Sequence, residues 1–239
     1  MTSCRLLFHV HTHHSADAVL SPETIVRYCS KNGIEIVAIC DHDFLLPHRE
    51  RIALEEKYGV RIIPAIEYST ENGDIIGLFI EEACESHRCD EVLLDIRKQT
   101  GIAVLPHPMR GHRLEKINMA MIDAIEVFNG RCDAHENSLA AEKNTIWKKI
   151  GLAGCDAHFP WELGIAVNII NLPDENDLDD DEALKKSILS SPCIEIEGRG
   201  MPRLNTSFSL LIKAIKKRSM KALKDSLPMV KKSKGTSDR

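Results

Sequence analysis

The feature of this sequence that most constrains its fold is a regular alternation between short apolar runs and longer segments with helical patterning. The runs are rich in Ile, Val, Leu and Ala and are short enough to be buried strands. Strands that alternate with helices predict an α/β fold in which a parallel sheet is closed or nearly closed into a barrel, and eight of the candidate strands fit it. The expected strands, in chain order, are 6–8, 34–40, 60–66, 74–80, 102–106, 124–128, 152–155, 166–170 and 193–197.

Start and stop signals bound the segments between these strands. Ser21-Pro22 is typical of a helix start, because Ser caps the first turn and Pro fits the first helical position. Asn72-Gly73 is a turn signal between two strands. The expected helices are 22–32, 47–58, 89–99, 114–121, a longer helix that ends at Ile150, and 206–227, and the acidic stretch 174–182 is predicted to be a solvated loop.

The length and charge of the chain limit its organisation. At 239 residues it is long enough for one sizeable core, so we expect a single domain over residues 1–228, followed by a disordered basic tail, 229–239. Residues 213–239 carry ten Lys or Arg and two Asp or Glu, which gives this end a net charge near +8 and the preceding residues near −13. The basic end is interpreted as a solvated helix face and a frayed terminus, with contact to phosphate backbones as the alternative.

Signals for secretion and membrane insertion are missing from the sequence. No charged N-terminal segment precedes an apolar core, and no apolar run reaches the length of a membrane span. The eight cysteines are irregularly spaced and are interpreted as reduced thiols. We therefore expect a cytoplasmic protein without membrane contact, and its oligomeric state stays open.

Polar residues follow the ends of the expected strands, which is where parallel barrels gather their chemistry. They are His9, His11, Asp41, His42, Glu67, His107, Asp156 and His158. Histidines that only complete a core would not obey this rule, so we predict that these residues form one site. His9 and His11 also alternate along a strand and should face the same side. Taken alone, residues 9–17 would equally fit a solvated, His-rich turn.

The predicted set holds more ligands than one zinc requires, since a catalytic zinc takes about three protein groups. We therefore expect two to three divalent transition metals, with Glu67 bridging two of them. Paired ions hold a hydroxide between them and stabilise the charge that develops during attack on phosphorus. Mixed His, Asp and Glu ligands favour manganese, zinc or iron over magnesium, and the sequence does not choose among the three.

The ordered motifs resemble those of the PHP superfamily, the polymerase and histidinol phosphatase domain. They are His9-Val10-His11-Thr12 with Ser15 and Asp17, then Asp41-His42, Glu67, His107-Pro108 and Asp156-Ala157-His158, and the resemblance covers residues 5 to about 200. It implies a distorted (β/α)7 TIM-like barrel with three metals, so that one of the eight strands lies outside the barrel. Because most characterised members are phosphoesterases, it also implies a metal-dependent phosphoric ester hydrolase.

Carried over position by position, the resemblance assigns three groups of ligands. The first metal would take His9, His11, Glu67 and Asp156, the second would share Glu67 and add His107, and the third would take Asp17, His42 and His158. One position departs from the family's pattern, because the strand after Glu67 commonly begins with a ligand His and Asp74 stands there. Asp74 either binds the second metal through oxygen or only completes the turn, and both alternatives stay open.

Phosphate oxygens that no metal holds need cationic partners, and Arg offers bidentate geometry. Arg110, Arg131 and Arg199 are the candidates, and His9, Glu67, Asp156, Arg110 and Arg131 are taken as the catalytic residues. Glu126 alternates with buried neighbours and is expected to point into the barrel. His13 or His14 would donate a proton to the leaving oxygen, or both are solvated; His48, His87, His112 and His135 are expected at the surface.

The leading hypothesis is a phosphoesterase that hydrolyses a small phosphomonoester or nucleotide by attack of a metal-bridging hydroxide at a trinuclear site with an open mouth. One alternative is a PHP-type nuclease on single-stranded nucleic acid, with the basic end guiding the strand. An aromatic content of only 5% counts against a base-stacking platform of that kind. The other alternative is a non-catalytic metal-binding scaffold, against which the near-complete set of ligands argues.

Overall fold

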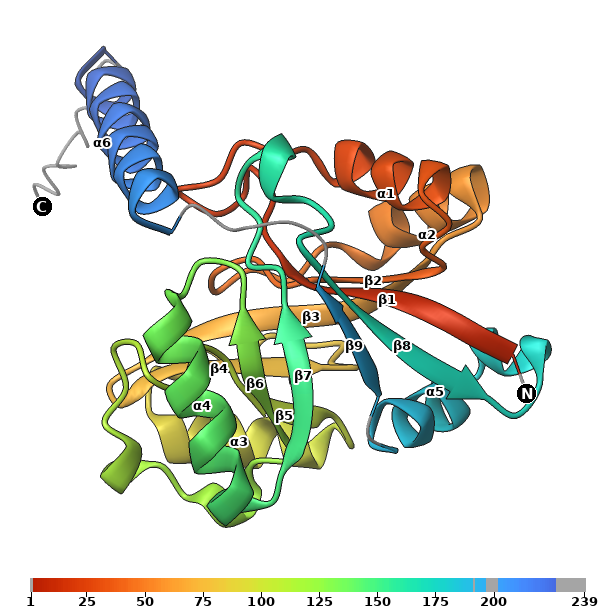
Figure 1. The fold of residues 1–239 in the computed structure, drawn as a ribbon. Coiled ribbons are helices and arrows are strands. Elements are labelled where there is room, and N and C mark those ends of the chain that lie inside the picture. Colours follow the sequence, from red (N-terminus) through yellow and green to blue (C-terminus); the bar gives the residue numbers. More distant parts are fainter. Residues whose placement is uncertain (1, 191, 197–201, 227–239) are drawn as a thin grey trace, which may run out of the picture.

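The computed structural model describes residues 2–190, 192–196 and 202–226, and shows strands at the centre with helices on the outside (Figure 1). The strands are β1 (Thr2–Val10), β2 (Ile36–Ile39), β3 (Arg61–Thr70), β4 (Gly73–Leu78), β5 (Ile102–Leu105), β6 (Ala124–Asn129), β7 (Ile150–Gly154), β8 (Ala166–Leu172) and β9 (Cys193–Ile196). The α-helices are α1 (Pro22–Lys31), α2 (His48–Tyr58), α3 (Cys89–Lys98), α4 (Ala134–Trp147), α5 (Asp181–Ile188) and α6 (Pro202–Ser226). The predicted α/β class is confirmed.

The described strands form one sheet in the order β7-β6-β5-β4-β3-β2-β1-β8-β9, and this sheet curls into a nearly closed barrel. The residues after β7 close the ring, because Cys155 N donates to Phe8 O (2.9 Å) and His11 N donates to Ala157 O (2.8 Å). Strand β8 pairs with the first half of β1, and β9 pairs with β8. Strands β1–β7 therefore make up the TIM-like barrel, with β8 and β9 as an extension of its sheet.

The predicted parallel arrangement is wrong for part of the sheet. Strand β4 is antiparallel to both β3 and β5, and β8 is antiparallel to β1. The connection between β3 and β4 is the short turn at residues 70–73, and a parallel crossover would need a dozen or more residues. The same Asn72-Gly73 signal that located the turn therefore also reverses the strand.

Three other boundaries differ from the predictions. Residues 114–121 form two 3-10 turns, η1 (Leu114–Lys116) and η2 (Met119–Met121), because Asn118 caps the second turn by accepting from Ala120 N. Helix α4 stops at Lys148, which adopts a left-handed φ of 52°, so Ile150 begins a strand. The acidic stretch 174–182 contains the 3-10 turn η4 (Glu175–Asp179) and the start of α5, where Asp180 caps the first turn.

Apolar side chains fill the interior of the barrel. Phe8, Ala38, Ile76, Val104 and Leu152, from five different strands, are fully buried in one cluster. The barrel is therefore a packed core rather than a pore, and the polar residues of the predicted site lie toward the carboxyl ends of its strands.

Helix α6 covers part of the barrel mouth and continues outward from the body (Figure 1). Its first half contacts the loop at residues 13–18, because Ser209 Oγ donates to Asp17 O (3.2 Å). A helix therefore borders the mouth, although none was expected to cap the site, and a cleft stays open beside it. None of the helices in the described part of the chain is both long and apolar enough to cross a membrane, and the predicted tail, 229–239, lies outside the described residues.

Candidate metal centre

A backbone bulge near the end of β1 brings two histidines together. The pairing of β1 with β2 shifts register between Leu7 and Val10, and His9 between them has a left-handed φ of 60°. The predicted convergence of His9 and His11 is found, with ring centroids 5.0 Å apart, although the bulge and not simple strand alternation produces it. Both rings are fully buried.

Glu67 lies at the centre of a ring of four histidines from three strand ends. Its Oε2 is 3.4 Å from His9 Nε2, 3.3 Å from His11 Nε2 and 3.0 Å from His42 Nδ1. Its other oxygen, Oε1, is 3.1 Å from His107 Nε2. The two carboxylate oxygens therefore face two different groups of nitrogen atoms.

Asp156, just after β7, lies against the same histidines. Its Oδ1 is 3.8 Å from His9 Nε2, 3.5 Å from His11 Nε2 and 3.4 Å from His158 Nδ1. The carboxylates of Glu67 and Asp156 thus approach the same pair of imidazoles. The predicted first group of ligands comes together in the structure.

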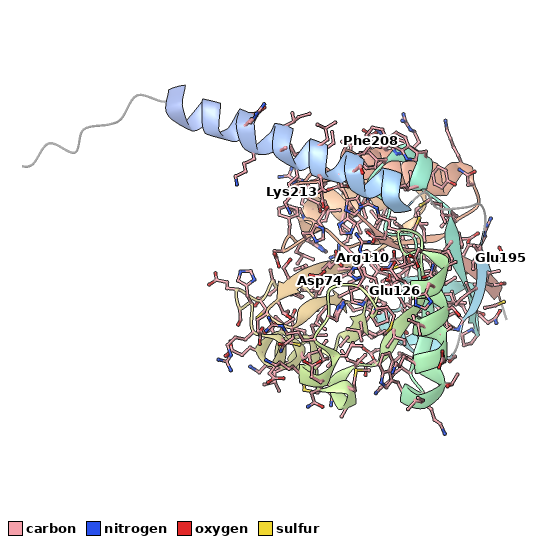
Figure 2. The ribbon with its side chains drawn as sticks, turned by 60° about the vertical axis from the view of Figure 1, so that its left-hand side comes forward. Asp74, Arg110, Glu126, Glu195, Phe208 and Lys213 are labelled. Carbon is pink, nitrogen blue, oxygen red and sulfur yellow. The ribbon has the colours of Figure 1, made fainter. Side chains whose placement is uncertain are left out.

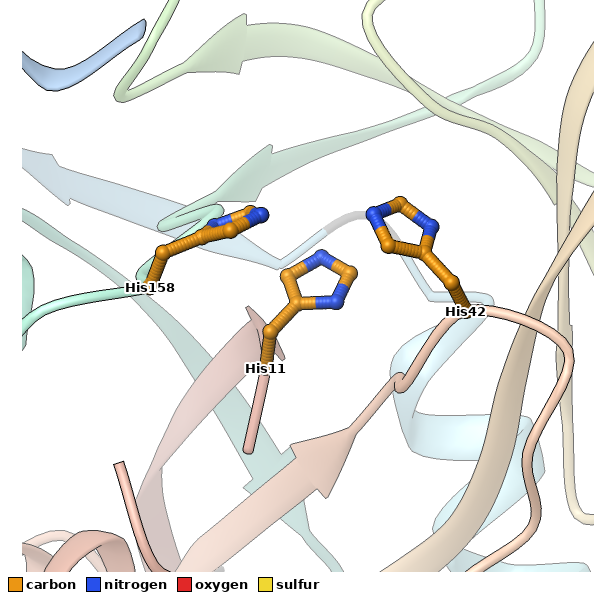
Figure 3. A group of neighbouring side chains, drawn as sticks. All are labelled: His11, His42 and His158. Atoms are coloured by element: carbon orange, nitrogen blue, oxygen red, sulfur yellow. The ribbon is translucent and has the colours of Figure 1, made fainter. Parts of the chain in front are cut away.

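A third group lies nearer the mouth. Asp17 Oδ1 is 3.7 Å from His42 Nε2 and 3.4 Å from His158 Nε2. Figure 3 shows His11, His42 and His158 with their rings gathered around one region, and the ring of His11 is 4.5 Å and 4.2 Å from those of His42 and His158. His11 therefore lies between the first and third predicted groups.

Asp74, the position that departs from the family pattern, also reaches the centre. It lies near the start of β4, half-buried, and its ligand atom is within 4.8 Å of those of Glu67 and His107. Burial and the nearby Glu67 raise the pKa of Asp74. The structure places this carboxylate where the predicted second metal would need a ligand.

Three of the converging residues hold strained backbone conformations. His9, His107 and Asp156 have φ values of 60°, 27° and 52°, in the left-handed region that non-glycine residues rarely adopt. Such strain persists only where the surrounding structure holds it, and it concentrates at functional sites.

Burial and charged neighbours strongly shift the pKa values of the histidines in this cluster. Burial lowers the pKa of His9, but Glu126, Glu67 and Asp156 outweigh it, so the pKa is raised well above its usual value. Burial also opposes the charge of His42, yet Glu67 raises its pKa to about 9. Burial with the neighbouring His158 and His42 lowers the pKa of His11 to about 4.

The pKa values of the two central carboxylates, Glu67 and Asp156, are lowered. Burial raises the pKa of Glu67, but His9 and His42 outweigh it and hold the pKa well below its usual range. Asp156 behaves in the same way, because His9 and His11 outweigh its burial and lower its pKa. The cluster therefore holds closely spaced carboxylate charges next to its imidazole rings.

The residues present fit divalent metal ions. Among the described residues, His9 Nε2, His11 Nε2 and Asp17 Oδ1 are buried and have no hydrogen-bond partner. Leaving such atoms unsatisfied is costly, and imidazole nitrogens with carboxylate oxygens are the ligands of manganese, zinc and iron. Four overlapping groups of potential ligand atoms occur here, each within 4.8 Å.

A carboxylate behind the ligands orients them. Glu126 Oε1 is 2.7 Å from His9 Nδ1, and Glu126 Oε2 accepts from His107 N (2.7 Å) and from Asn129 Nδ2 (2.8 Å). Glu126 is buried and points into the barrel, as its alternation predicted. A Cβ atom on Gly154 would overlap Glu126 Oε1, so only glycine leaves room for this carboxylate.

Asp41 has a structural role that its position at a strand end did not reveal. It is buried and accepts hydrogen bonds from Thr12 N (2.6 Å), Thr12 Oγ1 (2.5 Å) and Ser15 Oγ (2.6 Å). Ser15 Oγ in turn accepts from His42 N (3.1 Å). The sequence did carry a signal for this role in the two hydroxyl residues after His11, Thr12 and Ser15. A hydroxyl group that is buried needs a hydrogen-bond acceptor, and Asp41 provides it.

A cleft of about 620 Å³ opens above the candidate ligands, and two predicted arginines line it. Arg110 is half-buried at its edge. Arg131 is buried, with Nε 3.2 Å from Glu162 Oε1, and Nη2 donates to Ser209 Oγ (2.9 Å). Glu162, which was not predicted, also accepts from the backbone of His158. The guanidinium group of Arg131 is therefore largely paired within the protein. The third predicted arginine, Arg199, lies outside the described residues.

Two further histidines border the site. His14 lines the cleft and stacks on Phe44, with ring centroids 4.2 Å apart. His112 is not at the surface as predicted, because its ring packs 5.5 Å from that of His107 and Nε2 lies 2.9 Å from Asp74 O. Gly73, which leaves no Cβ in its way, lets the ring approach.

Comparison with protein families identifies the chain. The model of the PHP domain matches residues 8–150, and a model described as PHP-associated matches residues 134–188. The chain therefore belongs to the PHP domain family, and the resemblance inferred from its motifs is confirmed.

Individual relatives agree with this assignment. Two uncharacterised proteins of Methanocaldococcus jannaschii are similar in sequence, one 33% identical over 56% of this chain and 88% of the relative, the other 31% identical over 74% and 76%. A two-domain protein of Bacteroides vulgatus containing a predicted PHP-like metal-dependent phosphoesterase has a similar structure, with a TM-score of 0.64 and 14% identity over 90% of this chain and 70% of that one.

A lesion-specific endonuclease of Pyrococcus furiosus is also structurally similar, with a TM-score of 0.56 and 16% identity over 82% of this chain and 58% of that one. At this level of identity both structures show a shared fold.

Proposed function

We propose that this protein is a phosphoesterase that hydrolyses a small phosphomonoester or nucleotide with the help of three divalent ions. The first ion would take His9, His11, Glu67 and Asp156, the second Glu67, Asp74 and His107, and the third Asp17, His42 and His158. The groups of ligand atoms that lie within 4.8 Å of one another support this division. Manganese, zinc and iron all suit such ligands.

The position of Glu67 carries the proposal. One of its oxygens faces His9, His11 and His42, and the other faces His107. A carboxylate placed in this way can serve two ions at once, which is typical of sites that hydrolyse phosphate esters.

The reaction would join a water-derived oxygen to phosphorus and break the ester P–O bond. Bound ions would supply Lewis-acid activation of water and of the phosphoryl group. Arg110, at the edge of the cleft, would bind phosphate oxygens through its guanidinium group. His14 also lines the cleft and would give a proton to the departing oxygen.

A nuclease is the second candidate function. Two observations favour it: the structural likeness to an endonuclease, and the basic residues of α6 beside the cleft. The substrate would then be a phosphodiester, with Arg110 in the same role. We also propose a cytoplasmic location, which all eight cysteines, free in the structure, support.

Activity assays on the metal-loaded protein test both candidates. The protein with manganese would be offered an aryl phosphate, mononucleotides and a single-stranded oligonucleotide. We expect turnover of a phosphomonoester that falls at least 100-fold in His9→Ala, because a ligand of the first ion is lost. The exposed His135→Ala on α4 is the matched control and should retain full activity. Release of mononucleotides without monoester turnover would favour the nuclease, and silence on all substrates with intact folding would reject both.

A further inference from the structure

One face of α6 presents three polar residues to the candidate site. Ser209, Lys213 and Lys216 are four and three positions apart, so they lie on one side of the helix. Figure 2 shows Lys213 on α6, above the part of the body that carries Arg110 and Asp74. The sequence interpretation of this helix as a solvated basic face did not foresee such contacts.

The two outer residues fix the helix to the loop that carries Asp17. Ser209 Oγ accepts from Arg131 Nη2 (2.9 Å) and donates to Asp17 O (3.2 Å). Lys216 Nζ donates to three backbone carbonyls, those of His13 (3.0 Å), Ser15 (2.7 Å) and Ala18 (2.7 Å). An ammonium group has three donors, and here all of them are used by one loop.

The middle residue, Lys213, remains directed to the cleft. It lines the cleft together with Arg110, and no described residue forms an ion pair with it. The acidic and histidine side chains that line the cleft include the candidate metal ligands. A lysine held between two anchors, beside an arginine and without a carboxylate partner, has the surroundings of an anion-binding group.

We propose that Lys213 is a substrate-binding residue whose ammonium group contacts a phosphate oxygen of the substrate in the cleft, with α6 held over the mouth for this purpose. The proposal rests on the proposed function, because it gives the phosphoester one more partner. It also assigns a use to the basic residues of α6 that does not depend on nucleic acid.

Binding of inorganic phosphate to the full-length, manganese-loaded protein tests this proposal. Lys213→Met removes the charge and keeps the apolar stem, and Arg218→Met, at an exposed position on the far side of α6, is the matched control. Isothermal titration calorimetry should show phosphate affinity about tenfold or more weaker in Lys213→Met, since a charge-assisted hydrogen bond is lost. Arg218→Met should match the original protein, Lys213→Arg should recover part of the affinity, and metal content should be the same in all.

Steady-state kinetics provide a second test of the role of Lys213. In Lys213→Met the KM for a phosphomonoester should rise by a similar factor, with a smaller effect on kcat. If the original protein binds phosphate and turns over substrate while Lys213→Met is equal to it in both, the role of Lys213 is rejected and the proposed function stands. If the metal-loaded original protein neither binds phosphate nor hydrolyses any phosphoester, both proposals fail.

Discussion

Nδ1 of His9 lies 2.7 Å from Oε1 of Glu126, and this contact determines which nitrogen of His9 faces the candidate metal centre. When Nδ1 carries the proton and donates it to Glu126, Nε2 is left with a free lone pair, directed toward Glu67 and Asp156. The second oxygen of Glu126 accepts from the backbone of His107. One buried carboxylate therefore positions candidate ligands at the ends of two strands.

Removing this carboxylate should weaken metal binding. We expect Glu126→Ala to lower the affinity for manganese or zinc by about 10- to 100-fold, the usual cost of losing a group that orients a histidine ligand. Competition with a chromogenic chelator measures the change. The exposed Glu142→Ala, on α4, is the control and should have no effect. Unchanged affinity in Glu126→Ala would show that His9 is oriented without it.

Gly154 offers an independent test of the same contact. A Cβ atom at this position would overlap Glu126 Oε1, so Gly154→Ala should displace the carboxylate and weaken metal binding by a similar factor. Because both changes act through one contact, the double variant Glu126→Ala/Gly154→Ala should bind metal no more weakly than Glu126→Ala alone. Additive losses in this double-mutant cycle would show that Gly154→Ala acts by another route.

Asp41 should contribute to stability rather than to metal binding directly. Asp41→Ala leaves Thr12 N, Thr12 Oγ1 and Ser15 Oγ without their acceptor, all inside the protein. We expect the free energy of unfolding of the metal-free protein to fall by about 2–4 kcal/mol. Urea unfolding measures this, and the exposed Asp179→Ala should change it by less than about 0.5 kcal/mol. An equal effect of both variants would refute the role of Asp41.

The residues of the candidate site could be predicted because the barrel fold fixes where such residues stand in the sequence. In a barrel of mainly parallel strands the carboxyl ends lie at one end, so a sequence that places His, Asp or Glu after successive apolar runs already specifies their convergence. The inward orientation of Glu126 was likewise predicted, from the alternation of side chains along its strand. Even so, the bulge at His9 was not visible, because a left-handed histidine leaves no mark in a pattern of apolar residues.

What could not be predicted are contacts between segments far apart in the chain. Ser209 and Asp17 are 192 residues apart, and nothing in the helical pattern of α6 indicates which loop it covers. The contact of His112 with Asp74 depends on the reversed direction of β4, which brings the start of that strand to the mouth. The ion pair of Arg131 with Glu162 likewise requires the fold to be known.

The sequence leaves two roles open for Asp74, and substitutions at this position distinguish them. If it binds the second ion, Asp74→Ala should abolish or weaken one metal site by at least tenfold and leave the other sites unchanged, while Asp74→His should restore or strengthen it. Metal content after dialysis and competition with a chelator measure this. If it only completes the turn, Asp74→Ala should instead lower the thermal stability of the metal-free protein with the metal content unchanged.

The last prediction concerns protons that leave when metal enters. In the metal-free protein burial lowers the pKa of these histidines, but the nearby carboxylates outweigh it. They raise the pKa of His9 and His107 and raise that of His42 to about 9, so the protonated rings are favoured and His42 holds its proton at pH 7. A ring must lose the proton on its coordinating nitrogen to bind metal, so binding should release protons, and affinity should increase as the pH rises from 7 toward about 9. Calorimetric titrations with manganese in two buffers of different ionisation enthalpy measure the number released. His135→Ala should release the same number, whereas no release, or uptake, would show that the carboxylates do not hold these histidines in the charged form.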